Sequence, residues 1–247
     1  MDNPFSLKGK TILITGASSG IGKTTSIECS KLGAKIILTG RNTKRLEETM
    51  ALLTGEGHQL KVLDLNISEA VSEFIENMPK LDGVVYCAGT QRTCPIKFIQ
   101  REDIDKVFET NFFANININT LLLSKKKINK GASIVFISSI AAGIVAEVGN
   151  AIYSASKGAL SSYAKVLALE MSSQRIRVNC VLPGMVNTPL LKKLDVEEDQ
   201  LKEDEKRYPL GYGNPEDVAY SVIYLLSDAT KWVTGSNLIL DGGLTLK

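Results

Sequence analysis

The stretch that decides the fold is Lys10–Leu32, which reads KTILITGASSGIGKTTSIECSKL. Its first six residues form a short apolar run typical of a buried strand, and Gly20–Leu32 has helical spacing. Three glycines shape the turn between them, in the spacing G-x-x-x-G-x-G: Gly16, Gly20 and Gly22. Glycines in a strand-to-helix turn let the backbone approach a pyrophosphate, and free N–H groups at the helix N-terminus attract its charge. The stretch predicts a dinucleotide-binding turn, and it lacks the Gly-Lys-Ser/Thr of a P-loop.

The rest of the chain repeats this alternation of strand and helix. Further strands are expected at Lys35–Thr39, Leu60–Leu65, Gly83–Tyr86, Ser133–Ser138, Arg177–Leu182 and Ser236–Leu240. Further helices are expected at Thr43–Leu53, Ser68–Asn77, Arg101–Ile128, Asn150–Met171 and Pro215–Leu226. Continuous apolar strands separated by helices indicate a parallel sheet covered on both faces. We therefore predict a doubly wound α/β Rossmann fold with a sheet of about seven strands, and one domain over 1–247.

One segment differs in composition. Leu190–Pro209 contains many charged residues and few apolar anchors. A solvated amphipathic helix and a mobile lid fit this pattern equally well. If the segment is a lid, residues 190–212 are predicted to cover the substrate.

Composition excludes several classes of protein. The 247 residues are 44% hydrophobic and 23% charged, with a net charge of +2, which gives no reason to expect nucleic acid or membrane as a partner. The four cysteines form no CxxC pair, and there is no apolar signal core or membrane span, so a cytoplasmic protein is expected. Lys125–Lys127 is interpreted as a solvated helix end. The single histidine, His58, is interpreted as an exposed loop residue, which argues against a Ser-His-Asp hydrolase and a zinc site.

A second motif is Tyr153-x-x-x-Lys157. Four residues along a helix place both side chains on one face, where an ammonium lowers the pKa of a phenol and suits it to acid–base chemistry. The expected strand before it ends at Ser138-Ser139, which brings a hydroxyl toward the same place.

Together these motifs resemble the short-chain dehydrogenase/reductase family. The resemblance rests on TGASSGIG, the Ser-Ser pair, YSASK, Pro183-Gly184 with Thr188, PEDVA at Pro215–Ala219 and TGSNLILDGG at Thr234–Gly243. It extends from about Leu7 to the C-terminus, and in outline it is close to 3-oxoacyl-(acyl-carrier-protein) reductases.

The resemblance implies catalytic roles. Ser139 would hydrogen-bond the substrate oxygen, with Ser138 as its rival, and Tyr153 would transfer the proton. Lys157 would hold the nicotinamide ribose and tune Tyr153, while Asn111 would help to hold a water in the proton relay. The implied reaction interconverts a carbonyl and a secondary alcohol, and the alternative is a catalytically silent cofactor-binding scaffold.

The resemblance also implies a cofactor site. Its residues would be Gly16, Ser18, Ser19, Gly20, Ile21, Gly22, Arg41, Asp64, Leu65, Ala88, Gly89, Tyr153, Lys157, Pro183, Gly184, Val186 and Thr188. NAD enzymes usually carry a carboxylate at the end of the second strand, where this chain has Thr39-Gly40-Arg41. Arg41 offers a planar cation suited to a phosphate, so NADP(H) is the expected cofactor and NAD(H) the alternative.

Substrate and assembly are less defined. Candidate substrate-lining residues are Gln91, Ala141, Ala142, Asn150 and Met185, and the substrate could be a 3-oxoacyl thioester, a sugar or a small ketone. A homotetramer is implied, because the two long helices and the last strand match the family's interfaces. The helices also carry more apolar residues than one buried helix face requires: Phe108, Phe112, Phe113 and Leu160. One departure concerns the family's Asn-Asn-Ala-Gly, which here is Tyr86-Cys87-Ala88-Gly89. It calls local order at the cofactor loop into question, and Cys87 is expected to be a buried small hydrophobe.

Overall fold

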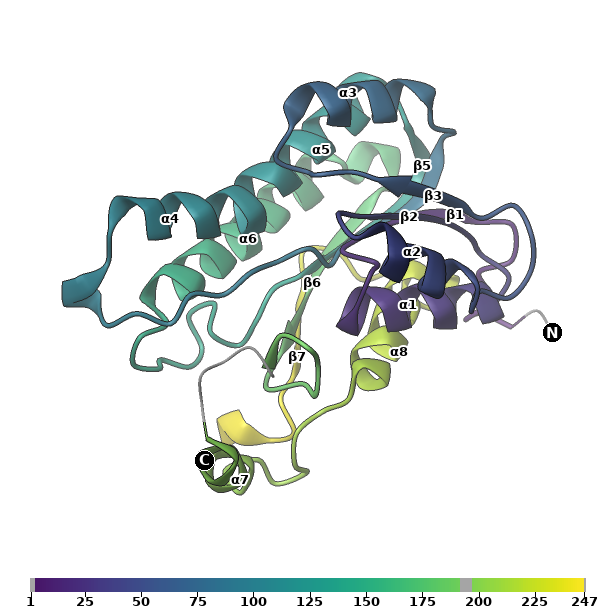
Figure 1. The fold of residues 1–247 in the computed structure, drawn as a ribbon. Helices are drawn as coiled ribbons and strands as arrows, with labels where there is room; N and C mark the ends of the chain where they lie inside the picture. The colour runs from purple at the N-terminus through teal and green to yellow at the C-terminus, as the bar shows by residue number, and fades with distance from the viewer. Residues whose placement is uncertain (1–2, 192–196, 247) are drawn as a thin grey trace.

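The computed structural model describes residues 3–191 and 197–246, and its centre is one parallel sheet (Figure 1). In these residues the sheet has seven strands in the order β3-β2-β1-β4-β5-β6-β7. Their bounds are β1 Thr11–Thr15, β2 Lys35–Gly40, β3 Gln59–Val62, β4 Leu81–Tyr86, β5 Ile128–Ile137, β6 Arg177–Pro183 and β7 Asn237–Leu240. Every pair is parallel, which confirms the predicted doubly wound Rossmann fold.

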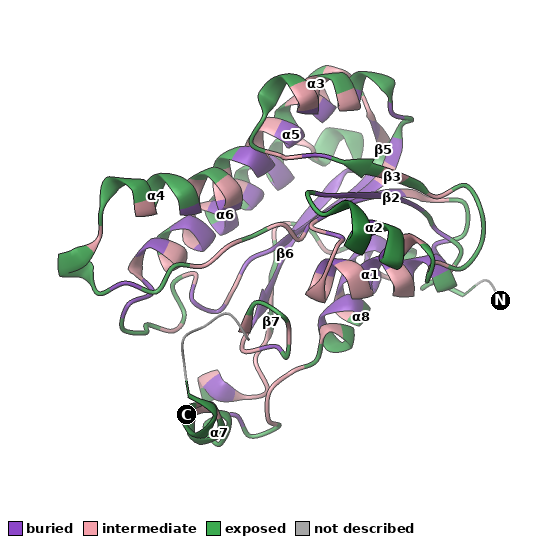
Figure 2. Ribbon diagram, in the orientation of Figure 1, coloured by how far each residue is buried: buried purple, intermediate pink, exposed green. Residues whose placement is uncertain are grey.

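Helices cover both faces of this sheet. Successive residues of β1 point to opposite faces, with Ile12 in one apolar core and Leu13 in the other. The first core includes α1 (Gly20–Lys31), α2 (Thr43–Met50) and α8 (Pro215–Leu226), and the second includes α3 (Ser68–Asn77), α5 (Ala114–Ser124) and α6 (Ala151–Glu170). Figure 2 shows that the central strands of the sheet are mostly buried, whereas the edge strand β3 is mostly exposed. No helix in the described residues is long and apolar enough to cross a membrane.

The predicted single helix Arg101–Ile128 ends earlier, at Ser124, and it contains a π-helical turn. The chain forms α4 (Arg101–Phe108), a π-helical turn (Glu109–Phe113) and α5, and Ile128 already belongs to β5. The helix ends because Lys126 takes a left-handed conformation, with φ of 55°. Lys127 then donates to the carbonyl oxygens of Glu76 and Met78 at 2.8 Å, so this lysine caps the end of α3 rather than lying free in water.

Two smaller expectations also need correction. The third strand ends at Val62 rather than Leu65, and the N–H of Leu63 still donates to the Gly40 carbonyl at 2.9 Å. His58 is half-buried rather than exposed, because its Nδ1 accepts from the N–H of Ile36 at 3.1 Å and its Nε2 lies 3.1 Å from the Thr54 carbonyl oxygen. The histidine therefore joins the loop before β3 to β2.

The loop after β4 is well anchored despite its unusual sequence. The ring of Tyr86 is buried and stacks on Phe136 with centroids 4.6 Å apart. Its hydroxyl lies 3.4 Å from Asn119 Oδ1, and the Asn119 amide donates to the Tyr163 hydroxyl at 2.9 Å. The N–H groups of Cys87 and Ala88 both donate to Thr15 Oγ1 at 3.2 Å. Stacking and these hydrogen bonds hold the loop without the family's asparagines.

Candidate active site

A cavity of about 890 Å³ opens at the carboxyl ends of β4, β5 and β6. In open parallel sheets this edge is where ligands bind, and the volume suits a small-molecule site. Its lining includes Ser139, Tyr153 and Lys157, together with Ile21 of α1 and Gly89. Three of the four sequence-predicted catalytic side chains, Ser139, Tyr153 and Lys157, and part of the predicted cofactor site therefore face one space.

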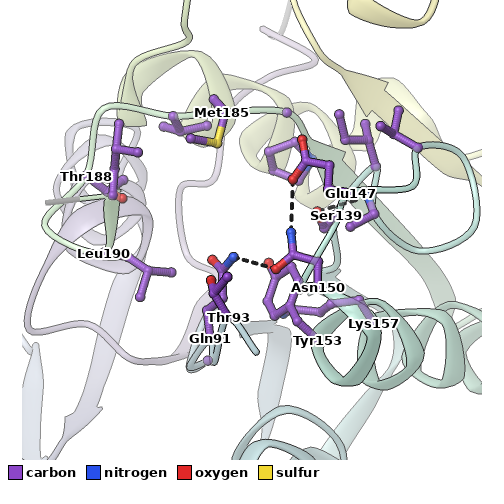
Figure 3. Close-up of a pocket in the computed structure, with 18 of the residues that line it drawn as sticks. Gln91, Thr93, Ser139, Glu147, Asn150, Tyr153, Lys157, Met185, Thr188 and Leu190 are labelled. Atoms are coloured by element: carbon purple, nitrogen blue, oxygen red, sulfur yellow. Dashed lines mark hydrogen bonds between the residues drawn. The ribbon is translucent and has the colours of Figure 1, made fainter. Parts of the chain in front are cut away.

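Tyr153 lies near the start of α6 and Ser139 lies in the loop after β5, and both line the cavity (Figure 3). The pKa of the Tyr153 hydroxyl is raised above its usual 10, chiefly by burial; a hydrogen bond with Ser139 partly offsets this, and the charge of Glu147 adds to it. The expected lowering by Lys157 is absent, and the neighbouring charge that does act, Glu147, raises the pKa of Tyr153 further. In the protein alone Tyr153 is thus a protonated acid at neutral pH.

Lys157 lies one helical turn beyond Tyr153, as the spacing predicts. Its ammonium is 5.8 Å from the centroid of the Tyr153 ring and donates to the Ile137 carbonyl oxygen at 2.7 Å. The side chain is buried, and burial lowers its pKa from 10.5 to about 8. The cation is held deep in the cavity, with protons left to donate to another group.

Ser138 and Ser139 have different roles in the structure. The Ser138 hydroxyl is buried and bonds the Lys157 carbonyl at 3.0 Å and Ser161 Oγ at 2.9 Å. Ser139 Oγ accepts from the N–H of Ala141 at 3.1 Å and remains close to Tyr153. Between the two rivals, the geometry favours Ser139 for contact with a substrate.

Asn111 does not line the cavity. It is fully buried in the π-helical turn, where its Oδ1 accepts from the N–H of Thr90 at 2.8 Å. Its amide donates to the Thr90 carbonyl at 2.9 Å and to Ser156 Oγ at 3.0 Å. The side chain thus ties the loop after β4 to α6, and a π turn of this kind often marks a functional site.

The glycine turn after β1 is closed by tight backbone contacts. A Cβ on Gly16 would lie 2.8 Å from the nitrogen of Ala88, and one on Gly22 would lie 2.4 Å from the carbonyl oxygen of Gly16. A Cβ on Gly20 would lie 3.4 Å from Thr188, and φ at Gly20 is 51°. Glycine is therefore required in the turn, which packs against the loop after β4 and the loop after β6.

The opposite end of the predicted cofactor site is at β2 and β3. Ser18 approaches Gly40, since a Cβ there would be 3.4 Å from Ser18 Oγ. Asp64 is half-buried and accepts from the N–H of Asn66 at 3.1 Å. Arg41 is exposed at the end of β2, where Asn42 caps α2. Ser18, Gly40 and Arg41 thus surround the end of β2, which is the position that discriminates cofactors in Rossmann folds.

The segment predicted to cover the substrate does contribute to the cavity. It contains α7 (Glu198–Glu205), and the lining includes Leu190, Leu201, Asp204, Arg207 and Tyr208. Arg207 pairs with Asp204 at 2.6 Å, and the Tyr212 hydroxyl donates to Asp204 at 2.8 Å. Part of 190–212, residues 192–196, lies outside the described residues.

Four of the five candidate substrate-lining residues face the cavity: Gln91, Ala141, Asn150 and Met185. Ala142 instead lines a neighbouring cavity of about 690 Å³. The sequence reasoning missed Glu147 and Thr93, which also line the main cavity. Their signal was their position, since each follows a strand end and precedes a helix, where loops surround such a site.

Other chemistries find little support in the described residues. No three His, Cys, Asp or Glu side chains gather there to hold a metal. Burial raises the pKa of the Cys87 thiol to about 12, which leaves it protonated and unreactive at neutral pH.

Comparisons with known proteins agree with this geometry. The family profile described as "Enoyl-(Acyl carrier protein) reductase" matches residues 16–245. A 3-oxoacyl-[acyl-carrier-protein] reductase of Rickettsia felis is 38% identical, covering 97% of this chain and 98% of its own length. The corresponding reductase of Thermotoga maritima is 33% identical, over 97% of this chain and 99% of its own length.

Solved structures show the same fold. A putative short-chain alcohol dehydrogenase from Sinorhizobium meliloti superposes with a TM-score of 0.89 and 27% identity, covering 99% of this chain and 100% of its own. A short-chain type dehydrogenase/reductase from Mycobacterium marinum gives a TM-score of 0.87 and 26% identity, covering 99% and 98% of the two chains. The chain therefore belongs to the short-chain dehydrogenase/reductase family and is an NAD(P)-dependent oxidoreductase that acts on CH–OH groups.

Proposed function

We propose that the protein reduces a ketone to a secondary alcohol with NADPH, using Tyr153 as the proton donor. The observation that carries this proposal is the convergence of Ser139, Tyr153 and Lys157 on one cavity beside the glycine turn. The raised pKa of Tyr153 supports it, because a donor must hold its proton until the carbonyl oxygen gains charge. When bound, the nicotinamide supplies the hydride.

Each catalytic residue has a distinct task in this proposal. Ser139 and Tyr153 donate hydrogen bonds to the carbonyl oxygen, which stabilises the alkoxide that develops there. Lys157 holds a ribose hydroxyl and stabilises the phenolate that remains when Tyr153 gives up its proton. Asn111 has a positioning role, because its side chain hydrogen-bonds Thr90 in the loop after β4 and Ser156 on α6.

The residues fit a dinucleotide that crosses the edge of the sheet. Cβ atoms would fill the space at Gly16 and Gly22, so only the backbone can line the phosphate turn. At the adenosine end, Asp64 and Leu65 would lie near the adenine, and Ser18 and Ser19 would lie on the phosphate side. Ala88 and Gly89, after β4, would line the middle of the site. Pro183, Gly184, Val186 and Thr188 would hold the nicotinamide side.

NADP(H) is the proposed cofactor rather than NAD(H). Thr39, Gly40 and Arg41 carry no carboxylate that would repel a 2′-phosphate, and Arg41 is exposed directly after Gly40, which Ser18 approaches. Lys23, which follows the glycine turn on α1, would add positive charge. A charge-assisted contact to the phosphate contributes about 1.5–3 kcal/mol.

The substrate class is a compact ketone, and three candidates remain: a 3-oxoacyl thioester, as the names of the Rickettsia and Thermotoga relatives suggest, a sugar, or a small ketone. The protein is also proposed to act as a homotetramer, with one interface on the layer of α4, α5 and α6 and the other near β7. Leu160 takes no part in this, because it is fully buried within the subunit.

The test is NADPH oxidation at 340 nm over a panel of ketones, with Tyr153→Phe as the matched inactive variant. Wild type should turn over at least one class, and Tyr153→Phe should lose about 10²–10⁴-fold in kcat while still binding NADPH. A protein that binds NADPH and reduces nothing on the panel would support the silent scaffold instead.

A further inference from the structure

A row of three hydrogen-bonded side chains lines the cavity beside Tyr153 (Figure 3). Gln91 Nε2 donates to Asn150 Oδ1 at 2.9 Å, and Asn150 Nδ2 donates to Glu147 Oε2 at 2.9 Å. Gln91 comes from the loop after β4, whereas the other two precede α6. The proposed transfer of hydride and proton assigns no task to this row.

Asn150 gives the row a fixed geometry. Its side chain is nearly buried, with 7% exposed, and both amide atoms are occupied by the neighbours. The backbone N–H of Ser154 donates to the Asn150 carbonyl at 2.8 Å, so the residue is the N-terminal cap of the helix that carries Tyr153. The Glu147 carboxylate is therefore oriented relative to the catalytic hydroxyl.

The row keeps free acceptors at its two ends, besides one further N–H on each of the Gln91 and Asn150 amides. A carboxylate has no proton to donate, and only one of the Glu147 oxygens is occupied by Asn150. The amide oxygen of Gln91 is a second acceptor on the same side. Acceptors of this kind match the O–H groups of a ligand, and they offer nothing to the methylenes of an acyl chain.

The charges around the opening of the cavity also favour Glu147 as a group that binds the ligand. Asp204 and Arg207 of the opposite wall neutralise each other in a 2.6 Å ion pair. The charge of Glu147 nevertheless contributes to a raised pKa of Arg207, after the larger effect of Asp204, so the carboxylate faces that wall across the opening. Within the described lining, Glu147 is thus the carboxylate that forms no ion pair of its own.

We propose that Glu147, oriented by Asn150, binds a hydroxyl group of the substrate next to the reacting carbonyl. This rests on the proposed ketone reductase function and narrows its substrate class to small hydroxylated ketones, including short sugars, in preference to 3-oxoacyl thioesters. Because Glu147 is exposed and is hydrated in the free protein, the preference comes from the hydrogen bond to the carboxylate that the hydroxylated ketone makes and the analogue does not.

The experiment compares ketones that differ in a hydroxyl and little else. The pairs are hydroxyacetone with 2-butanone, and dihydroxyacetone with 3-pentanone, each measured as kcat/KM with saturating NADPH. Erythrulose and the N-acetylcysteamine thioester of acetoacetate extend the panel to a short sugar and an uncharged 3-oxoacyl thioester. Wild type should favour the hydroxylated member of at least one pair by about tenfold or more, as expected for a hydrogen bond to a charged group.

Variants of Glu147 test whether the preference for hydroxylated ketones comes from this row of side chains. Glu147→Ala should reduce the ratio to about twofold or less, and Glu147→Gln should give an intermediate ratio, because its amide oxygen still accepts. The matched control is Glu73→Gln on α3, an exposed carboxylate that does not line the cavity. It should leave both kcat/KM values and their ratio unchanged.

Three outcomes would overturn the inference: no hydroxyl preference in wild type, a preference that Glu147→Ala leaves intact, or a higher kcat/KM for the thioester than for every hydroxylated ketone. In all three, the reduction of some ketone would leave the proposed function standing. Failure of the proposed function looks different, since no member of the panel would then be reduced.

Discussion

The ammonium of Lys157 donates to the carbonyl oxygen of Ile137 at 2.7 Å, which joins α6 to the last residue of β5. This is a cation buried between a helix and the sheet, and burial lowers its pKa to about 8. The residue is therefore retained at a cost to stability, and that cost leads to two predictions.

Replacing Lys157 by Met should stabilise the fold and abolish turnover. The unfolded chain binds this proton more tightly than the folded chain, so the charged form destabilises the fold at neutral pH. Against this, the Ile137 carbonyl loses its donor, which costs about 1 kcal/mol. We expect a net gain of about 1–2 kcal/mol in the free energy of unfolding at pH 7. Urea unfolding measures it, and a loss of stability would contradict the reading of Lys157 as a strained cation.

The same gain should shrink as the pH rises. The folded-state pKa of Lys157 is about 8, below its ordinary 10.5, so wild type regains stability between these values as the lysine loses its proton. Wild type and Lys157→Met should therefore converge in stability toward pH 10. Parallel curves from pH 7 to 10 would show that the pKa of Lys157 is normal.

Activity should depend on the same proton in the opposite sense. In reduction Tyr153 must be protonated, and its raised pKa keeps it so throughout the neutral range. Lys157 is charged below about pH 8, so kcat/KM for ketone reduction should be flat up to about pH 7 and fall above about pH 8. A pH profile at saturating NADPH checks this. A rate that is constant to pH 9.5 would separate catalysis from the charge of Lys157.

The fold and the catalytic cluster were predictable because both depend on local pattern. Glycine spacing after a short strand specifies a turn that admits no Cβ at Gly16 or Gly22, and that requirement is visible in the sequence. Tyr153 and Lys157 share a face because they are four residues apart on a helix. Such features need no knowledge of distant parts of the chain.

The misses came from tertiary contacts. The π-helical turn at Glu109–Phe113 carries Asn111, which bonds Thr90, a residue distant in sequence. After the left-handed Lys126 ends α5, Lys127 bonds the Met78 carbonyl oxygen. The pKa of Tyr153 moved in the direction opposite to that expected, because burial is set by the whole site rather than by one neighbour. Periodicity contains none of this information.

Asn111 should be important for stability as well as for catalysis. Asn111→Leu removes three hydrogen bonds and leaves the Thr90 N–H and carbonyl without their partner, which should cost about 2–4 kcal/mol in the free energy of unfolding. The matched control is Asn117→Leu on α5, where a single 3.4 Å contact with Ser68 is lost at the surface. Equal costs for the two variants would argue against a special role for the π-helical turn.

Arg41 should determine the choice of cofactor. Wild type is expected to favour NADPH over NADH by at least about tenfold in kcat/KM, from the value of one charge-assisted contact. Arg41→Ala should lose most of this ratio through KM for NADPH, with kcat little changed. Arg45→Ala, an exposed arginine one turn along α2, is the control. If wild type prefers NADH, the assignment of Arg41 is wrong.

The final prediction concerns assembly, and it follows from two separate groups of exposed apolar side chains. Phe113, Val166 and Leu169 lie on the helical layer, with 51%, 58% and 75% of their surface exposed. Trp232, Ile239 and Leu246 lie near the C-terminal edge of the sheet, and Trp232 is almost completely exposed. An interface that covers each group would remove these apolar side chains from water. Two distinct self-complementary surfaces on one subunit generate a closed tetramer, so light scattering should give four times the 26.8 kDa monomer mass. Val166→Glu and Trp232→Glu should each give a dimer by breaking a different interface, and the double variant should be monomeric. A wild-type protein that stays monomeric at micromolar concentration would refute the assembly.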